Sequence, residues 1–171
     1  MATDAGDRTS AGSRSEFIDA TAERFPLDEI SKKIIGRLQE DGRRSYASIG
    51  KEVGLSEAAV RQRVQKLLDA KVFQIVAVTD PLQLGFHRNA MIGVRCSGDM
   101  IKTADEISKL TAVDYCVVTA GTFDIFAEVV CENDEELLNI IQTIRAIDNV
   151  RETETLMYLS LRKQIYNWGT P

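Results

Sequence analysis

The chain has 171 residues, of which 44% are hydrophobic and 27% are charged. This length and composition are typical of a globular protein with one or two small domains. No apolar run approaches the roughly 18–20 residues that a membrane-spanning helix needs. The polar, acidic start of the chain contains no hydrophobic signal core. We therefore expect no membrane association and a cytoplasmic location.

The three cysteines, Cys96, Cys116 and Cys131, lie within apolar runs. Their odd number and the lack of a CxxC pair argue against a disulfide framework and against a zinc site. The single histidine, His87, excludes a site built from several histidines. We predict reduced thiols, no metal and no cofactor.

The net charge of −5 is unevenly distributed along the chain. Residues 27–71 contain ten Lys and Arg against seven Asp and Glu, whereas residues 72–171 contain eight against fourteen. A basic module in an acidic chain favours a polyanionic partner, although so small an excess is also typical of a solvated surface.

Residues 1–26 form a polar extension that we predict to be flexible. Across residues 27–71, apolar side chains recur at spacings of three and four, which predicts three helices joined by tight turns. Ser45 and Ser56 have the right type and position to be N-caps of the second and third helices. Gly54 ends the second helix.

Two helices joined at Gly54 form a helix-turn-helix. In such a module the second helix lies in the major groove, and its first residues contact base edges. Arg61 suits the acceptors of guanine, and Gln62 suits adenine. The helix start at Ser56 suits a phosphate. The predicted DNA-binding residues are Arg43, Arg44, Ser45, Ser56, Glu57, Ala58, Arg61, Gln62, Arg63, Gln65 and Lys66, with Lys33 as a further backbone contact.

Some of these positions have a second interpretation. Arg61 and Gln62 are also side chains that an ordinary solvated helix face carries. Arg63 can pair with an acid such as Glu52 instead of contacting DNA. The turn, the caps and the local charge excess favour the DNA-reading interpretation.

After residue 71 the apolar pattern changes period. The apolar run 72–78 predicts a strand, and residues 72–86 form a linker strand and hinge. Residues 87–171 predict a βαββαβ order, the ferredoxin-like arrangement, with both helices on one face of an antiparallel sheet. The fold class is α+β. The predicted elements span 89–96, 101–110, 113–119, 123–131, 134–147 and 150–161.

The strand at 123–131 predicts which face of the sheet the helices cover. Its alternate apolar residues, which we expect against the helices, are Phe123, Ile125, Ala127 and Val129. Phe126 and Val130 fall on the opposite face, where a monomer would expose them to water. We therefore expect a homodimer through that face.

These motifs resemble those of the Lrp/AsnC, or feast/famine, family of transcription regulators. The helical part carries Asp41-Gly42-Arg43-Arg44-Ser45-Tyr46 and Val53-Gly54-Leu55-Ser56-Glu57, and the sheet part carries Asp80-Pro81 and Ala120-Gly121-Thr122-Phe123-Asp124. The resemblance covers residues 27 to about 163. Departures are local: Gly50 stands where the family tends to have alanine, and Lys71 and Phe73 stand where it tends to have glycine and isoleucine.

The resemblance implies a winged-type helix-turn-helix joined by a strand to a ferredoxin-like ligand-binding domain. It also implies dimers that assemble to tetramers or octamers. The implied effector is a small molecule, usually an amino acid, bound between dimers near the hairpin Gly121-Thr122-Phe123-Asp124.

An amino acid needs donors for its carboxylate and an acceptor for its ammonium group. The N–H of Gly121 suits the carboxylate and Asp124 suits the ammonium, although both residues are also ordinary members of a hairpin. The predicted effector-binding residues are Tyr115, Thr119, Gly121, Thr122, Asp124, Thr153 and Thr155.

We therefore expect a regulator that binds double-stranded DNA sequence-specifically and responds to an amino acid or a related metabolite. The alternative is an architectural protein that wraps DNA with weak specificity and has no dedicated amino-acid effector. An enzyme is disfavoured, because the sequence shows no paired acid and base, no nucleophile with its base and no phosphate loop.

Overall fold

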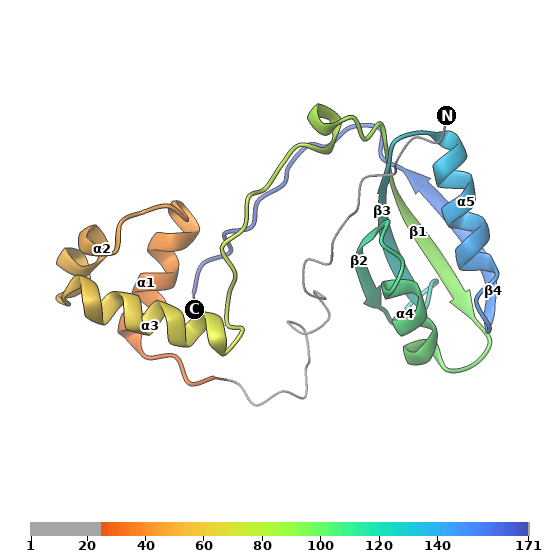
Figure 1. The fold of residues 1–171 in the computed structure, drawn as a ribbon. Coiled ribbons are helices and arrows are strands. Elements are labelled where there is room, and N and C mark those ends of the chain that lie inside the picture. Colours follow the sequence, from red (N-terminus) through yellow and green to blue (C-terminus); the bar gives the residue numbers. More distant parts are fainter. Residues whose placement is uncertain (1–24, 171) are drawn as a thin grey trace. The chain divides into compact units, whose positions relative to one another are not determined.

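The computed structural model describes residues 25–170, so the predicted flexibility of residues 1–24 falls outside the described range. The elements in chain order are α1 (Glu29–Glu40), α2 (Tyr46–Val53), α3 (Glu57–Asp69), the 3-10 helix η2 (Pro81–Leu84), β1 (Arg88–Cys96), α4 (Met100–Ser108), β2 (Val113–Val118), β3 (Ile125–Cys131), α5 (Asp134–Arg145) and β4 (Val150–Met157) (Figure 1). They form two compact units. Among the described residues, the sheet unit spans Thr79–Leu161, and the helical unit combines residues 25–78 with residues 162–170.

Side-chain caps begin all three helices of the helical unit. Asp28 Oδ1 accepts a hydrogen bond from the N–H of Ser31 at 2.7 Å and starts α1. Ser45 and Ser56 cap α2 and α3 in the same way, as predicted. Such caps satisfy backbone donors that have no partner within the helix. Gly54 ends α2 at φ 75°, a left-handed conformation that glycine adopts without strain.

A single small core holds these helices together. Its buried side chains are Ile34, Leu38, Ile49, Val60 and Val64. Helices α1 and α3 each contribute two of these side chains, four residues apart, and α2 contributes Ile49 between them.

The predicted linker strand is absent from the single chain. Residues 73–80 belong to no helix or strand, and Ile75, Val76 and Val78 are exposed. An apolar run of this kind has the composition of a strand, but a strand also needs a neighbour for its backbone hydrogen bonds. Composition alone does not supply that neighbour.

The sheet unit has the predicted βαββαβ order. Its strands pair antiparallel in the spatial order β2-β3-β1-β4, and α4 and α5 cover one face (Figure 1). The buried core comes from alternate strand residues and one stripe of each helix. These residues are Ala90, Ile92, Val94, Ala104, Ile107, Ile125, Ala127, Val129, Cys131, Leu137, Ile140 and Ile144.

The predicted position of Phe123 against the helices is wrong. Phe123 is 9% exposed, but it packs over Gly93 on the opposite face, with its ring centroid 5.4 Å from that of Phe126. The reason is that β3 begins only at Ile125, so strand alternation does not extend back to residue 123. The last strand is also shorter than predicted and ends at Met157.

Candidate DNA-binding and effector-binding sites

Helix α3 divides cleanly into a buried and an exposed face. Val60, Val64 and Leu67 are buried. The exposed residues include six of the predicted DNA contacts, namely Glu57, Ala58, Arg61, Gln62, Gln65 and Lys66. The helix therefore presents a continuous polar surface that starts at the Ser56 cap.

Two contacts hold Arg61 near the start of α3. Its Nη2 donates to Glu57 Oε1 at 2.8 Å, and its guanidinium carbon lies 5.3 Å from the ring centroid of Tyr46. Both the arginine and the glutamate are largely exposed, and such surface pairs contribute little stability. Exchanging Glu57 for a base edge is therefore inexpensive.

Arg63 lies on the side of α3 that faces α1. Its Nη1 donates to Asp28 Oδ2 at 2.7 Å and to Ser31 Oγ at 3.3 Å. Hydrogen bonds from Ser31, and then the one from Arg63, lower the pKa of Asp28 to about 2. The acid that pairs with Arg63 is thus Asp28, and the predicted alternative partner, Glu52, is wrong.

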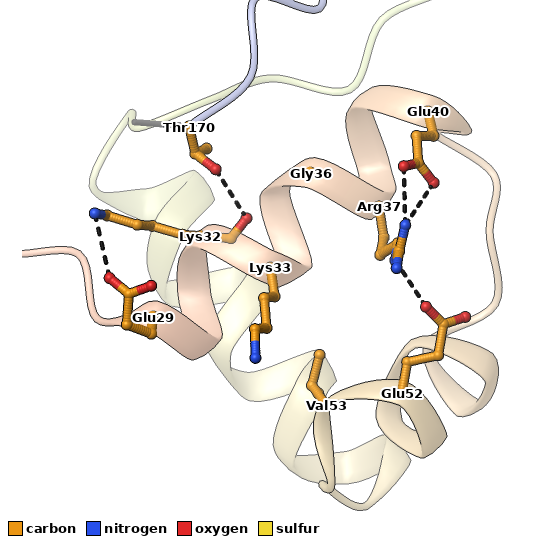
Figure 2. Close-up of a pocket in the computed structure, with 9 residues that line it drawn as sticks. All are labelled: Glu29, Lys32, Lys33, Gly36, Arg37, Glu40, Glu52, Val53 and Thr170. Carbon is orange, nitrogen blue, oxygen red and sulfur yellow. Dashed lines mark hydrogen bonds and ion pairs between the residues drawn. The ribbon is translucent and has the colours of Figure 1, made fainter.

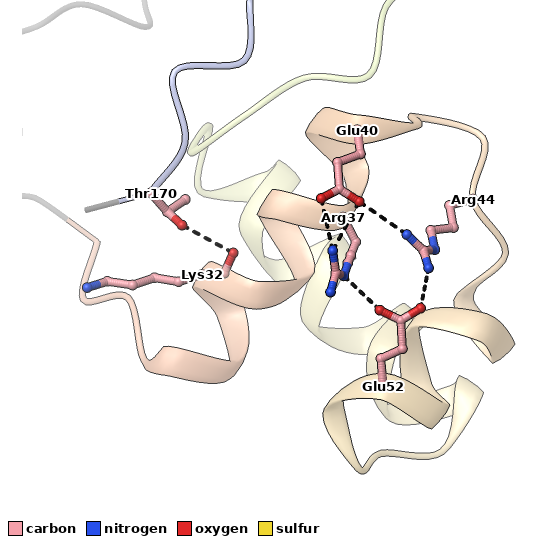
Figure 3. A network of polar contacts seen from close by, with 6 residues as sticks. All are labelled: Lys32, Arg37, Glu40, Arg44, Glu52 and Thr170. Atoms are coloured by element: carbon pink, nitrogen blue, oxygen red, sulfur yellow. Dashed lines mark hydrogen bonds and ion pairs between the residues drawn. The ribbon is translucent and has the colours of Figure 1, made fainter.

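Glu52 instead joins a network between α1 and α2 (Figure 3). Arg37 Nε donates to Glu52 at 2.7 Å, Arg44 donates to the other oxygen of Glu52, and both arginines also contact Glu40. Arg44, predicted to bind phosphate, is therefore held within the protein in the DNA-free chain. Arg43 beside it is exposed.

A polar cavity of about 490 Å³ lies next to this network (Figure 2). Residues of α1 line most of it, and Thr170 closes one side by donating a hydrogen bond to the carbonyl of Lys32 at 3.5 Å. Along its wall, Arg37 pairs with Glu40 and with Glu52. Internal pairing of this kind favours a structural role for the cavity.

In the sheet unit, the predicted hairpin holds Asp124 in a fixed position. The N–H of Cys96 donates to Asp124 Oδ2 at 2.7 Å, and the N–H of Asp124 donates to the carbonyl of Val94 at 2.9 Å. Thr119 Oγ1 donates to the carbonyl of Phe123 at 2.7 Å and closes the hairpin. A Cβ at Gly121 would meet no heavy atom within 4 Å apart from those of its two chain neighbours, so the hairpin is not crowded at this residue.

A cavity of about 380 Å³ lies beside this hairpin. Thr122 and Asp124 of the predicted set line it together with four residues that the sequence analysis missed, namely Arg95, Cys96, Arg151 and Glu152. The missing information was the strand register, which pairs Arg95 of β1 with Glu152 of β4. No local motif in the sequence carries that pairing.

The predicted effector residues do not all share this cavity. Thr153 and Thr155 pair with Val94 and Ile92, so they lie on the face of the sheet that the helices cover. Thr153 Oγ1 accepts from Arg145 of α5 at 2.7 Å. Tyr115 pairs with Glu128 on the opposite face and is 42% exposed. Within one chain the two threonines and Tyr115 line different surfaces.

Two family models match the chain. An AsnC-type helix-turn-helix domain matches residues 27–68, and a C-terminal dimeric alpha+beta barrel domain matches residues 86–171. The HTH-type transcriptional regulator FL11 of Pyrococcus horikoshii is 34% identical over 143 residues, which are 82% of this chain and 95% of that protein. The chain belongs to the Lrp/AsnC family of transcriptional regulators.

Solved structures agree with this assignment. The structure of Escherichia coli AsnC is 26% identical in sequence to this AsnC-family chain and has a TM-score of 0.71. The matched region is 83% of this chain and 98% of the AsnC chain. A transcriptional regulator from Neisseria meningitidis in complex with L-methionine is 22% identical, with a TM-score of 0.71 and coverage of 85% and 97%. At that identity the second likeness concerns the fold alone.

This AsnC-family regulator is thus a DNA-binding protein built from a helix-turn-helix and an α+β domain. Among residues 25–170, no helix is long and apolar enough to cross a membrane. In the same range, no three His, Cys, Asp or Glu side chains gather as metal ligands do.

Proposed function

We propose that this protein recognises a specific DNA sequence through α3 and that an amino acid or a related metabolite modulates its binding or assembly. The observation that carries the proposal is the exposed polar face of α3, in which Arg61 is held, among the partners found in residues 25–170, only by Glu57 of the same helix and by Tyr46. Arginine and glutamine at the start of a recognition helix suit the major-groove edges of guanine and adenine.

The effector part of the proposal rests on the hairpin. Asp124 is a carboxylate held by the backbone N–H of Cys96, and a Cβ at Gly121 would meet nothing within 4 Å, so the hairpin is uncrowded there. Together they offer an acceptor for an ammonium group and donors for a carboxylate. The L-methionine complex of the Neisseria regulator is a precedent for an amino acid on this fold.

We further propose that the protein is a homodimer that assembles to a tetramer or octamer. The exposed sheet face carries apolar side chains, among them Val117, Phe126 and Leu156. The matching family model describes a dimeric barrel, which two such sheets form when their open faces meet. Linkage requires the effector to bind one assembly state better than another if it is to change DNA affinity.

The decisive experiment is a DNase I footprint on the DNA upstream of the protein's own gene, with and without a pool of the twenty amino acids. A periodic footprint that shifts or disappears with the pool supports the proposal. A footprint that ignores the pool and loses sequence preference at moderate salt instead indicates the architectural alternative.

Arg61→Ala tests the reading residue itself. Loss of a bidentate base contact costs about 1–3 kcal/mol at the cognate site and relaxes the base preference there. Lys109→Ala is the matched control, because Lys109 is also an exposed cation paired within its own chain segment, to Glu106, but lies in the sheet unit. If Arg61→Ala and Lys109→Ala bind the cognate DNA with the same affinity and the same base preference, Arg61 does not contact the DNA bases.

A further inference from the structure

The cavity beside the hairpin has an uneven balance of paired and unpaired charge. Arg95 donates from Nε to the carbonyl of Thr122 at 3.0 Å and from Nη1 to Glu152 at 3.1 Å. Its guanidinium carbon also lies 5.2 Å from the ring centroid of Phe123. Arg95 and Glu152 therefore satisfy each other as part of the wall of the cavity.

Arg151 differs from Arg95 in this respect. It lines the same cavity, yet within residues 25–170 no hydrogen bond or ion pair engages its side chain. Glu152 is paired with Arg95, whereas Asp124 accepts only the neutral N–H of Cys96 through Oδ2. The charges left without an opposite partner among the described residues are therefore the carboxylate of Asp124 and the guanidinium group of Arg151. Once the ammonium group of an amino acid meets Asp124, the guanidinium group remains, and it pairs best with a planar carboxylate.

These contacts divide the work of binding an amino acid. The second oxygen of Asp124 accepts from the ammonium group, and the hairpin backbone at Thr122, which lines the cavity, is the donor for the α-carboxylate. The side chain of the ligand then meets Arg151. A basic side chain would face two guanidinium groups, with Glu152 already occupied, whereas an acidic side chain supplies the missing counter-charge. The volume of about 380 Å³ lies in the range of small-molecule sites, roughly 300–1,000 Å³.

We propose that the effector is an amino acid with a carboxylate side chain, L-aspartate or L-glutamate, and that Arg151 is the residue that selects it. This inference rests on the proposed function, in which the hairpin binds an amino acid.

The test is isothermal titration calorimetry of the full chain with L-glutamate, L-glutamine, L-aspartate, L-asparagine and L-lysine. Each amide matches its acid in size and lacks only the charge. A charge-assisted pair with Arg151 should make the acids bind roughly 10- to 100-fold more tightly than their amides. L-Lysine should bind more weakly than either amide.

Three variants assign that preference to one residue. Arg151→Gln should reduce the preference for acid over amide to less than about threefold while amide binding persists. Arg151→Lys keeps the charge and should restore part of the preference. Lys102→Gln removes a cation from the exposed start of α4 and should leave every affinity unchanged.

The outcomes separate this inference from the function on which it rests. If an amide or L-lysine binds as tightly as the acids, or if Arg151→Gln keeps the preference, the selection of acids is refuted and an amino-acid effector remains. If none of the five compounds binds while the footprint persists, the inference is refuted and DNA binding stands. The response of the footprint to the pool of twenty amino acids then decides separately whether the effector is an amino acid.

Discussion

Gly50 of α2 lies against the backbone of the turn that leads to α3, and Gly50→Ala should destabilise the helical unit. A Cβ at this position would lie 2.5 Å from the carbonyl oxygen of Leu55. Carbon and oxygen atoms normally approach to about 3.3 Å, so the turn would have to move by roughly 0.8 Å. The N–H of Leu55 donates to the carbonyl of Gly50 at 2.9 Å, so the same movement strains that bond.

Two opposing effects decide the size of the change. Replacing glycine by alanine inside a helix stabilises it by about 0.5–1 kcal/mol. Overpacking at a close contact costs about 1–3 kcal/mol. The net expectation is a loss of about 0.5–2 kcal/mol. Alanine, which the family tends to have here, would therefore require a more open turn than this chain has.

The measurement is urea unfolding of the full chain followed by circular dichroism at the helical band. Gly36→Ala is the matched control, because Gly36 lies inside α1 of the same unit and a Cβ there would meet nothing within 4 Å. Gly36→Ala should raise the free energy of unfolding by about 0.5–1 kcal/mol, because alanine favours the helix more than glycine does and no close contact opposes it. If Gly50→Ala stabilises the protein as much as Gly36→Ala does, the close approach at Leu55 imposes no constraint and the reasoning fails.

Three further predictions follow from individual contacts. Hydrogen bonds from Ser31, and then the one from Arg63, lower the folded-state pKa of Asp28 from its ordinary 3.8 to about 2, so these contacts stabilise the fold above about pH 4 and their contribution is lost as the pH falls towards about 2. Arg63→Gln removes the part due to Arg63 and should therefore lose slightly less stability than the native protein between pH 7 and pH 3 in matched unfolding curves. Burial raises the pKa of the Cys116 thiol to about 11, so iodoacetamide at pH 8 should alkylate it far more slowly in the native protein than after unfolding. Peptide mass spectrometry measures the two rates, and fast labelling of the native protein would contradict the burial of this thiol. Phe126→Glu should yield a smaller particle in size-exclusion chromatography with light scattering, whereas Leu138→Glu, on the exposed side of α5, should not.

Local signals explain why the helical unit was predictable. Ser45 and Ser56 cap their own helices through hydrogen bonds that reach only three residues along the chain. Gly54 ends α2 by its own backbone conformation. Apolar spacing within each helix likewise depends on nearby residues alone. None of these features needs a partner from elsewhere in the sequence.

Contacts between distant segments account for the errors. The partner of Arg63 is Asp28, 35 residues away, and no periodicity distinguishes it from Glu52. Phe123 was assigned by extending the alternation of β3 two residues beyond its start. The pairing of Arg95 with Glu152 spans 57 residues and depends on the register of β1 with β4.

The same contacts provide a physical criterion for separating structural arginines from candidate functional ones. Arg63 and Arg44 bind acids on other elements, so releasing either side chain breaks a contact that holds two elements together. Arg61 binds an acid on its own helix and otherwise contacts only the Tyr46 ring among the described residues, so a ligand that replaced Glu57 would break no ion pair between elements. In the sheet unit Arg95 is a structural arginine by this criterion, whereas Arg151 has no protein partner to lose among the described residues. A ligand at Arg151 would therefore displace no protein contact among the described residues, and one at Arg61 would displace a largely exposed pair, which is why we propose these two positions as the ones that determine specificity.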